Sequence, residues 1–424
     1  MPQRRHFPHF DGLRAIAVLA VVLVHSSIYA GVARPGSAML PYIERLDVAV
    51  PVFLIISGFL LYRPFAVARL EGKPMPSLGL YAWQRGARII PGYWVALTIS
   101  ALWLTGLPDV LRPSGILTFY GFGQIYSSAT MSHGIPQAWT LCVEVAFYVC
   151  LPVWVLALRR VGAGEPRRWM RRELSMLAAL GAASLAYNVL VLYSDAAGPL
   201  IPTLTPLLTA LPGYMDQFAV GMALAVLSVG WEARGRLPRT LTWLDRWPGI
   251  AWLVALAVFL YAVKGSGLAR HAAGGFTHTQ YLVRHLLYTL IALGLVMPAA
   301  FGDVSRGLVR RFLALRPLAY LGIVSYGLYL YHALVLAKLY AWGWGSVHLV
   351  HPYVSWLLGC LAATLIPASL SWYLLERPAL RLRGRLLRRR AAAAGAGASA
   401  PAAGRAPRSA GEPDAPSPAR SERL

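Results

Sequence analysis

Long apolar stretches recur along the first 380 residues and constrain the fold more than any other feature of the sequence. Most of them approach the roughly 20 residues that a helix needs to cross a bilayer. Only 13% of the residues are charged, against roughly 25% in a typical soluble protein. We therefore predict an all-α membrane protein with about ten transmembrane helices, at residues 13–31, 48–67, 88–107, 137–158, 173–193, 208–229, 249–263, 281–301, 318–341 and 353–375.

Basic residues are distributed unevenly between the loops that join these stretches. Arg4 and Arg5 precede the first span, and the loops after the even-numbered spans carry basic clusters such as Arg171 and Arg172, whereas the opposite loops carry few. Because basic loops remain in the cytoplasm, both termini are predicted to be cytoplasmic in a multi-pass protein of the plasma membrane. The net charge of +23 is explained in this way, and without a basic-aromatic module we expect no nucleic-acid partner.

Two stretches fit the pattern less well, and the C-terminus has a different composition. The stretch 249–263 is the shortest, and 115–127 is interrupted by two glycines, so we interpret the latter as a re-entrant or interfacial segment. Residues 381–424 are first basic and then rich in Ala, Gly, Pro, Ser and Arg, which predicts a disordered cytoplasmic tail behind a membrane domain at 1–380. The first span resembles a signal peptide, but we favour an uncleaved helix because Arg14 interrupts the pattern.

The first span carries two residues that are costly in lipid, Arg14 and His25. A step of eleven residues is about three helical turns, so both side chains fall on one helix face, roughly 16 Å apart along the axis. A histidine can act as a general base for a hydroxyl or as an acyl-accepting nucleophile, and an arginine fork suits phosphate. The alternatives are a snorkelling arginine and a packing histidine. Because both lie on one face, we predict that this helix lines an active site.

Further polar residues near the spans extend this hypothesis. Arg85 and Arg88 share a helix face on the same side of the membrane as Arg14, and together the three can form an anion site or simply set orientation. Ser57 either bonds across helices beside Gly58, which permits close helix approach, or contributes to the same site.

A carboxylate in the fourth span, Glu144, is expected to pair with His25 and an arginine, or to serve only in helix pairing. Asp216 and His332 are further intramembrane residues that can line the same cavity. Asp11 is expected to cap the first helix. We expect Glu376 to fix the end of the last span, and the cysteines have neither metal-site nor disulfide spacing, so no metal is expected: Cys142, Cys150 and Cys360.

Taken together in this order, these motifs resemble the integral-membrane acyltransferases called acyltransferase family 3, over most of residues 8–380. Thr140 stands where that family more often has serine, which keeps the hydroxyl. The motifs are Asp-Gly-Leu-Arg with Arg-x10-His, Phe-x-x-x-Ser-Gly-Phe, Arg-x-x-Arg-x-x-Pro, Trp-Thr-Leu-x-x-Glu-x-x-Phe-Tyr, Ser-Tyr-x-x-Tyr-Leu-x-His and Glu-Arg-Pro.

The resemblance implies a ten-helix enzyme that transfers an acyl group, often acetyl, from acyl-CoA to a hydroxyl. The acceptor implied is a sugar in a cell-surface glycan, a glycolipid or a glycosylated natural product such as a macrolide. Carried over by position, His25 is the catalytic residue and Arg14 its motif partner. Arg85 and Arg88 are donor-phosphate contacts, with which we group Ser57.

Glu144 is our candidate for orienting the site or balancing its charge. We expect no permanently bound cofactor, with acyl-CoA (acetyl-CoA) as donor substrate and membrane lipids as surroundings. A transporter or flippase of a glycolipid or small solute is the alternative from a different class. The lack of an internal repeat or of paired broken helices weakens that alternative. A non-catalytic scaffold gives no reason for ionisable residues inside the spans.

Overall fold

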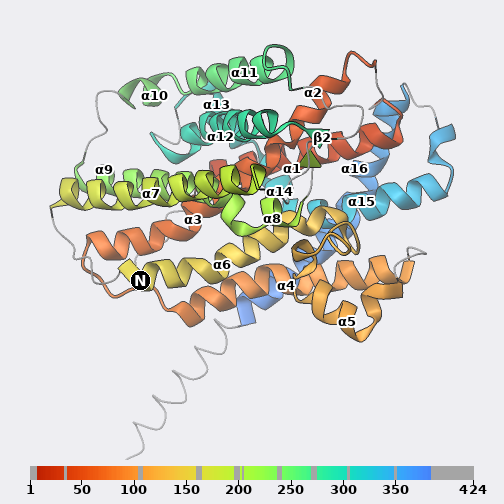
Figure 1. The fold of residues 1–424 in the computed structure, drawn as a ribbon, viewed down its shortest axis with the longest axis horizontal. Helices are drawn as coiled ribbons and strands as arrows, with labels where there is room; N and C mark the ends of the chain where they lie inside the picture. The colour runs from red at the N-terminus through yellow and green to blue at the C-terminus, as the bar shows by residue number, and fades with distance from the viewer. Residues whose placement is uncertain are drawn as a thin grey trace, which may run out of the picture. The chain divides into compact units, whose positions relative to one another are not determined.

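The computed structural model describes residues 7–32, 36–103, 108–158, 165–194, 201–202, 205–235, 241–268, 275–302, 306–347 and 351–382. Helices form nearly all of the regular structure in these ranges, and long helices lie side by side in Figure 1. Two short strands, β1 (Ile201–Pro202) and β2 (Gly275–Phe276), pair antiparallel with Ile201 opposite Phe276. The fold is therefore the all-α membrane bundle that the apolar stretches predict.

The helices follow one another along the chain with short connecting turns. The α-helices are α1 Pro8–Tyr29, α2 Leu40–Glu44, α3 Ala49–Leu70, α4 Leu78–Trp103, α5 Pro113–Gly115, α6 Trp139–Leu158, α7 Pro166–Leu192, α8 Pro206–Thr209, α9 Met215–Ala233, α10 Thr242–Arg246, α11 Gly249–Lys264, α12 His278–Ala300, α13 Leu308–Leu313, α14 Arg316–Ile323, α15 Ser325–Ala341 and α16 Pro352–Leu370. Single turns or π-turns are η1 Arg45–Val48, η2 Pro108–Leu111, η3 Ile116–Tyr120, η4 Gln124–Tyr126, η5 Pro136–Ala138, η6 Leu211–Tyr214, η8 Trp344–Ser346 and η9 Ser371–Glu376.

Each predicted span coincides with one of these helices or, for the ninth, with the pair α14 and α15. In the described ranges, seven helices are long and apolar enough to cross a membrane, and an eighth span results if α14 and α15, bent by 71°, count as one. The segments outside that count are α4, which carries two arginines, and the shorter apolar helix α11. Residues 115–127 form short turns rather than a long helix, as the glycine interruptions predict.

Several predicted boundaries are wrong by a few residues. The first helix begins at Pro8, so Asp11 lies in its first turn and does not cap it; its carboxylate instead pairs with Arg14 at 3.4 Å. The third helix begins at Leu78 rather than at residue 88, because a polar helix end has no hydropathy signal. The predicted tail, apart from its first two residues, lies outside the described ranges.

The last span does not end at Glu376 as predicted. The helix passes through the π-turn η9 and extends to Leu382. A π-turn accommodates one extra residue and shifts the backbone hydrogen bonds, so Pro378, which has no N–H to donate, does not break the helix. Glu376 is buried within this turn, where its Oε1 accepts a 3.2 Å hydrogen bond from Ser371.

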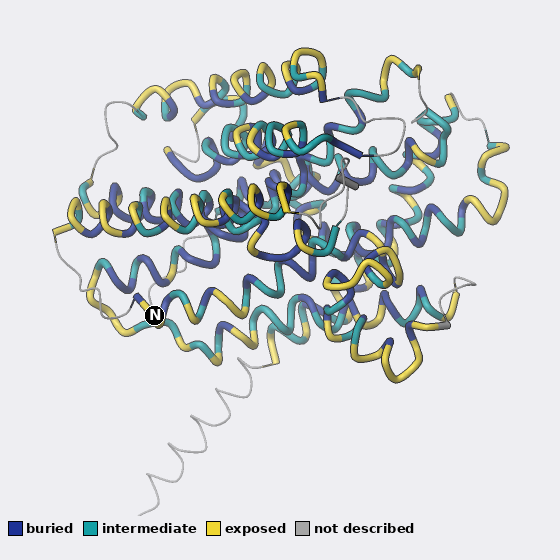
Figure 2. The backbone as a smooth tube through the Cα atoms, viewed as in Figure 1, coloured by how far each residue is buried: buried dark blue, intermediate teal, exposed yellow. Residues whose placement is uncertain are grey.

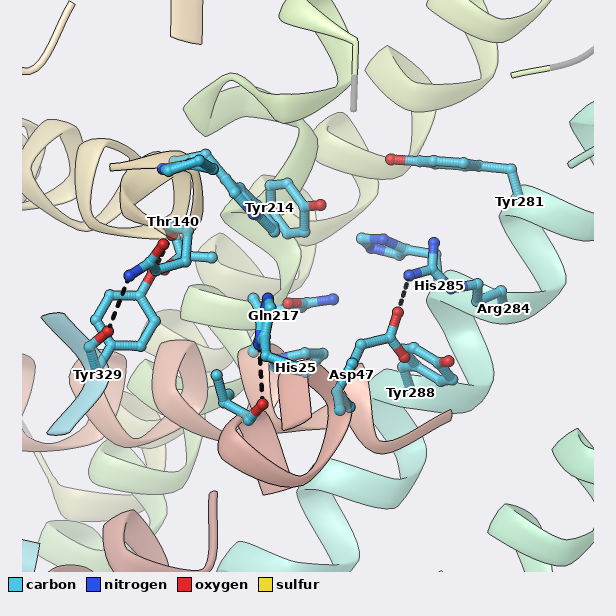
Figure 3. A pocket seen from close by; sticks show the side chains of 17 residues that line it. His25, Asp47, Thr140, Tyr214, Gln217, Tyr281, Arg284, His285, Tyr288 and Tyr329 are labelled. Carbon is cyan, nitrogen blue, oxygen red and sulfur yellow. Dashed lines mark hydrogen bonds and ion pairs between the residues drawn. The ribbon is translucent and has the colours of Figure 1, made fainter. Parts of the chain in front are cut away.

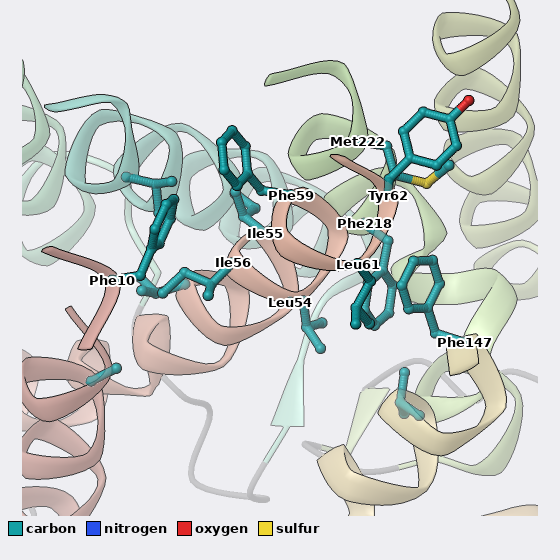
Figure 4. Packing of buried hydrophobic residues seen from close by; sticks show 14 of the residues in the cluster. Phe10, Leu54, Ile55, Ile56, Phe59, Leu61, Tyr62, Phe147, Phe218 and Met222 are labelled. Atoms are coloured by element: carbon teal, nitrogen blue, oxygen red, sulfur yellow. The ribbon is translucent and has the colours of Figure 1, made fainter. Parts of the chain in front are cut away.

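The centre of the bundle is the crossing of α3 and α9. A side chain at Gly58 would clash with the Phe218 carbonyl oxygen, and one at Gly221 with that of Ile55, so only glycine allows this approach. Phe218 stacks on Phe147 of α6 with centroids 3.9 Å apart, in the apolar cluster of Figure 4. The sequence-based interpretation of Gly58 as a packing residue is confirmed.

Burial differs sharply between the inner and outer helices. In Figure 2 the tube is mostly buried along α3 and exposed along the outer side of α7 and α11. Large apolar side chains on those outer helices are exposed, among them Leu190 at 72% and Leu253 at 64%. Such surfaces are stable in lipid rather than in water, which agrees with a multi-pass membrane protein.

Candidate active site

Helix α1 carries both Arg14 and His25, and these two residues face different cavities. Arg14 lines a cavity of about 90 Å³, which we name the Arg14 cavity. His25 lines a cavity of about 290 Å³ nearer the other end of α1, which we name the His25 cavity. Val21, which lies between them on the helix, lines both. The helix face predicted from the eleven-residue step therefore faces both cavities.

The Arg14 cavity collects positive charge. Arg85 and Arg88 of α4 line it together with Arg14, so the convergence expected from the sequence occurs. Arg14 interacts electrostatically with Arg88, and also with the carboxylates of Asp11 and Glu144. Clustered guanidinium groups that share few carboxylates favour an anionic ligand.

Glu144 lies in the Arg14 cavity and not in the His25 cavity. Its Oε1 accepts hydrogen bonds from Ser57 Oγ at 2.5 Å and from the Tyr148 hydroxyl at 2.7 Å. The expectation that Glu144 pairs with His25 is therefore wrong, because the register of α6 directs this carboxylate toward α3. Ser57 bonds across helices as one of its two interpretations predicts, and it also lines the cavity.

His25 is held by the backbone and by a second histidine. Its Nδ1 lies 2.9 Å from the Val21 carbonyl oxygen, so Nδ1 carries the hydrogen and donates. The Nε2 atom of His332 lies 3.3 Å from the same Nδ1, and the Nδ1 of His332 contacts the Tyr329 carbonyl at 2.8 Å. In a neutral ring held this way, Nε2 of His25 keeps its lone pair, as a base or nucleophile requires.

His332 is completely buried behind His25. The two rings meet edge to face with centroids 4.9 Å apart. The sequence-based interpretation placed His332 in the cavity, but it is absent from the described cavity lining, and its contact is with His25 itself. His332 therefore supports the ring of His25 from behind.

Figure 3 shows the His25 cavity, whose lining comes from η1, α3, η5, α6, η6, α9, α12 and α15 as well as α1. The cavity contains an ion pair between Asp47 and Arg284. The ring of His285 also lines it, and its Nε2 lies 2.8 Å from Asp216 Oδ2. A carboxylate thus orients a histidine in this cavity, but that histidine is His285 rather than His25.

A thin partition separates the two cavities. The side chains of Thr140 and Tyr329 line both, and their hydroxyls lie 2.7 Å apart. Tyr329 also donates to the Gln137 carbonyl. Because Val21 and Val50 line both cavities as well, the partition consists of only a few side chains.

A third cavity of about 600 Å³, the outer cavity, adjoins the Arg14 cavity on its other side. The two share Leu60, Leu61 and Arg85. Arg63 also lines the outer cavity and pairs with Glu232 at 2.7 Å. The three cavities thus follow one another, with arginines at one end of the series and His25 at the other.

Comparison with known proteins matches residues 7–372 to the family model described as the acyltransferase domain of acyltransferase family 3. The chain belongs to acyltransferase family 3. The match covers α1 through the start of η9, and so includes every element that lines the three cavities. The resemblance inferred from the motifs is confirmed.

Three relatives of this family 3 chain have printed functions. Nodulation protein 10 of Rhizobium leguminosarum bv. viciae is 27% identical over 91% of this chain and 96% of its own length. Acyltransferase MdmB of Streptomyces mycarofaciens is 24% identical over 91% and 94%. Peptidoglycan O-acetyltransferase OatA of Listeria monocytogenes is 22% identical over 88% of this chain and 56% of its own length. No solved structure matches the chain.

Sequence reasoning about this family 3 chain missed part of the His25 cavity. Asp47, Gln217, Arg284 and His285 were not selected, although Arg284 and His285 lie inside the predicted span 281–301. Their polarity within a span was the signal that could have identified them. Asp47 lies just outside a predicted span, so only the fold brings it to the cavity.

Proposed function

We propose that this protein transfers an acyl group, in particular acetyl, from acyl-CoA to a hydroxyl of a sugar-containing acceptor at the plasma membrane. One observation carries the proposal: α1 presents an arginine to one cavity and a histidine to the next, with a thin partition between them. This arrangement fits a donor that has an anionic head and a reactive group at the far end of a long arm.

The donor's phosphates would be held by Arg14, Arg85 and Arg88, because guanidinium groups bind phosphate oxygens in paired hydrogen bonds. The outer cavity offers room for the nucleotide beside Arg85. The narrow Arg14 cavity, with apolar residues such as Leu54 and Leu60 among its lining, suits a slender arm. The thioester would then reach the partition at Thr140 and Tyr329, near His25.

His25 would supply the proton transfer. Its Nε2 takes the proton of the acceptor hydroxyl as the oxygen attacks the thioester carbonyl carbon. The carbon–sulfur bond then breaks, and the proton passes from His25 to the departing thiolate, which leaves a free thiol and an ester. In the second route that this geometry allows, Nε2 first accepts the acyl group and then passes it to the hydroxyl.

Ser57 and Tyr148 would fix the Glu144 carboxylate beside the three arginines, which limits their mutual repulsion while leaving net positive charge for the donor. Glu144 is then a residue that balances charge at the donor site. The acceptor class is supported by the printed name of one relative, which O-acetylates peptidoglycan. Both termini would be cytoplasmic, which places the Arg14 cavity toward the cytoplasmic acyl-CoA pool.

The test uses the full-length protein purified in lipid nanodiscs with acetyl-CoA labelled in the acetyl group. Transfer is measured as alkali-labile label on a saccharide acceptor, with release of free CoA thiol in equal amount. Stopping the reaction with acid before acceptor is added separates the two routes, because only the second leaves label on the protein.

The proposal predicts transfer that depends on His25 and saturable binding of acetyl-CoA. Purified wild-type protein that neither binds acetyl-CoA nor modifies any acceptor would contradict it. Movement of an unmodified glycolipid across the bilayer, without covalent change, would favour the transporter instead.

A further inference from the structure

A wall of the His25 cavity carries polar groups that the reaction at His25 does not use. They are Gln217 of α9, Arg284 and His285 of α12, and Asp47 of η1. In Figure 3 they stand beside and beyond His25, between the aromatic rings of Tyr214, Tyr281 and Tyr288.

Gln217 is the most informative member of this wall because only 1% of it is exposed. Its Nε2 donates to Thr289 Oγ1 at 3.3 Å, and Thr289 Oγ1 in turn donates to the His285 carbonyl at 2.9 Å. The threonine hydroxyl has one hydrogen, which that carbonyl uses, so the amide must present its NH₂ group to Thr289. The orientation of the Gln217 amide is therefore fixed.

The other end of this amide is left for a ligand. Gln217 Oε1 has no hydrogen-bond partner within the described part of the chain, and neither does Arg284 Nε. A buried polar atom without a partner is costly, and such an atom beside a cavity implies a group that binds there. An acceptor oxygen and a donor N–H in one cavity match the hydroxyl group, which both donates and accepts.

The charges in the wall are already balanced. The Asp47 carboxylate pairs with the Arg284 guanidinium, and Asp216 Oδ2 accepts from His285 while its Oδ1 accepts from Ser184 at 3.3 Å. Both carboxylates also lie at helix starts, Asp47 just before α3 and Asp216 in the first turn of α9, where the helix dipole favours negative charge. An additional charged ligand group would find no uncompensated partner.

Aromatic rings complete the cavity. Trp139 and Tyr214 lie with ring centroids 5.7 Å apart, and the ring of Tyr281 lies parallel to that of His285 at 6.5 Å. Flat rings beside hydrogen-bonding side chains give a surface that is apolar on its faces and polar at fixed points. A volume of about 290 Å³ lies at the small end of the range for ligand pockets.

We propose that this wall is the acceptor subsite and that it takes a neutral, polyhydroxylated ring in preference to a sugar that carries an amine or a carboxylate. Gln217 Oε1 accepts from one ring hydroxyl and Arg284 Nε donates to another, which positions a third hydroxyl at His25. This inference rests on the proposed function, since it names the acceptor class of the same site.

The experiment measures ester formation from labelled acetyl-CoA with three tetrasaccharides of the same linkage type: neutral N-acetylchitotetraose, cationic chitotetraose and anionic tetragalacturonate. We expect the highest kcat/KM for the neutral probe. Gln217→Leu should raise the KM for that probe about 3- to 10-fold by loss of one buried hydrogen bond, while the KM for acetyl-CoA stays within twofold. Gln217→Glu should weaken the neutral probe and improve the cationic one.

Ser228→Ala serves as the matched control, because Ser228 is buried on the same helix and points to Glu232, about three turns from Gln217. Its kinetics should equal those of the wild type. An unchanged KM for the neutral probe in Gln217→Leu, or wild-type preference for a charged probe, would overturn the acceptor subsite while leaving the acyltransferase proposal intact. Failure of the wild type to bind acetyl-CoA would instead defeat the proposed function.

Discussion

The two cavities that meet at α1 differ in charge although they share a wall. The Arg14 cavity places three arginines around one carboxylate, Glu144, and thus has an excess of positive charge. The His25 cavity pairs its charged groups one to one, Asp47 with Arg284 and Asp216 with His285. One helix therefore connects a site suited to an anion with a site suited to a neutral molecule.

This difference explains why α1 needs both of its costly residues. An anionic donor head and a neutral acceptor cannot share a cavity of one electrostatic character without weakening the binding of one of them. Separating Arg14 from His25 by three turns, roughly 16 Å, keeps the phosphates away from the reaction. The predictions below test this division of labour, beginning with the largest effect.

Removing the histidine should abolish the function of the neutral cavity while sparing the cationic one. His25→Ala should lower the transfer rate by about 100- to 10,000-fold, as expected for loss of a general base, and leave acetyl-CoA binding unchanged. Transfer assays and equilibrium binding of labelled donor check this. The exposed loop residue His133 provides the control variant His133→Ala, and full activity of His25→Ala would exclude His25 from the mechanism.

Removing a cationic group should have the reverse pattern. Arg88→Ala should raise the KM for acetyl-CoA about 10- to 100-fold, through loss of charge-assisted hydrogen bonds, with little change in the KM for acceptor. Arg112→Ala, at an exposed arginine paired with Asp109 in a loop, is the control. If Arg88→Ala instead raised the acceptor KM alone, the assignment of the two cavities would be reversed.

His332 should act only through His25. His332→Leu should lower kcat about 3- to 10-fold, the effect of one buried hydrogen bond, and leave both KM values within twofold. His332→Gln should recover part of the loss, because an amide oxygen can accept from His25 Nδ1. Changes in KM without a change in kcat would assign His332 a binding role rather than a positioning one.

The partition should tolerate the smallest change. Thr140→Ser keeps the hydroxyl that contacts Tyr329 and should stay within twofold of wild-type kcat. Thr140→Val, of similar shape without the hydroxyl, should lower kcat about 3-fold. A severe loss in Thr140→Ser would show that the methyl group, rather than the hydroxyl, matters at this point.

Hydropathy was sufficient to place every helix that coincides with a predicted span, because a run of apolar residues must be buried in lipid or protein wherever it lies. It also pointed to Arg14, His25 and Glu144, since ionisable residues inside spans are costly. Helix ends were less accurate, as at Leu78 and Leu382, where polar turns extend apolar helices and a π-turn accommodates a proline.

The partners of these residues could not be predicted, because they depend on how each helix is rotated about its axis. One sequence pattern is compatible with Glu144 facing either His25 or Ser57, and only the packing of α6 against α3 decides between them. The contact of His25 with His332 joins helices more than 300 positions apart in the chain. Asp47 and Gln217 likewise became meaningful only when four helix starts met at one cavity.

The thin partition between the cavities also bears on the permeability of the membrane. With the cytoplasmic orientation proposed above, the cavities would lie toward opposite faces of the bilayer, and a continuous water-filled path through Thr140 and Tyr329 would let ions and protons flow down their gradients. Narrow constrictions prevent such flow by excluding water. The enzyme must therefore admit an acyl group through a gap that stays closed to water, and this requirement limits how far Tyr329 can move during each turnover.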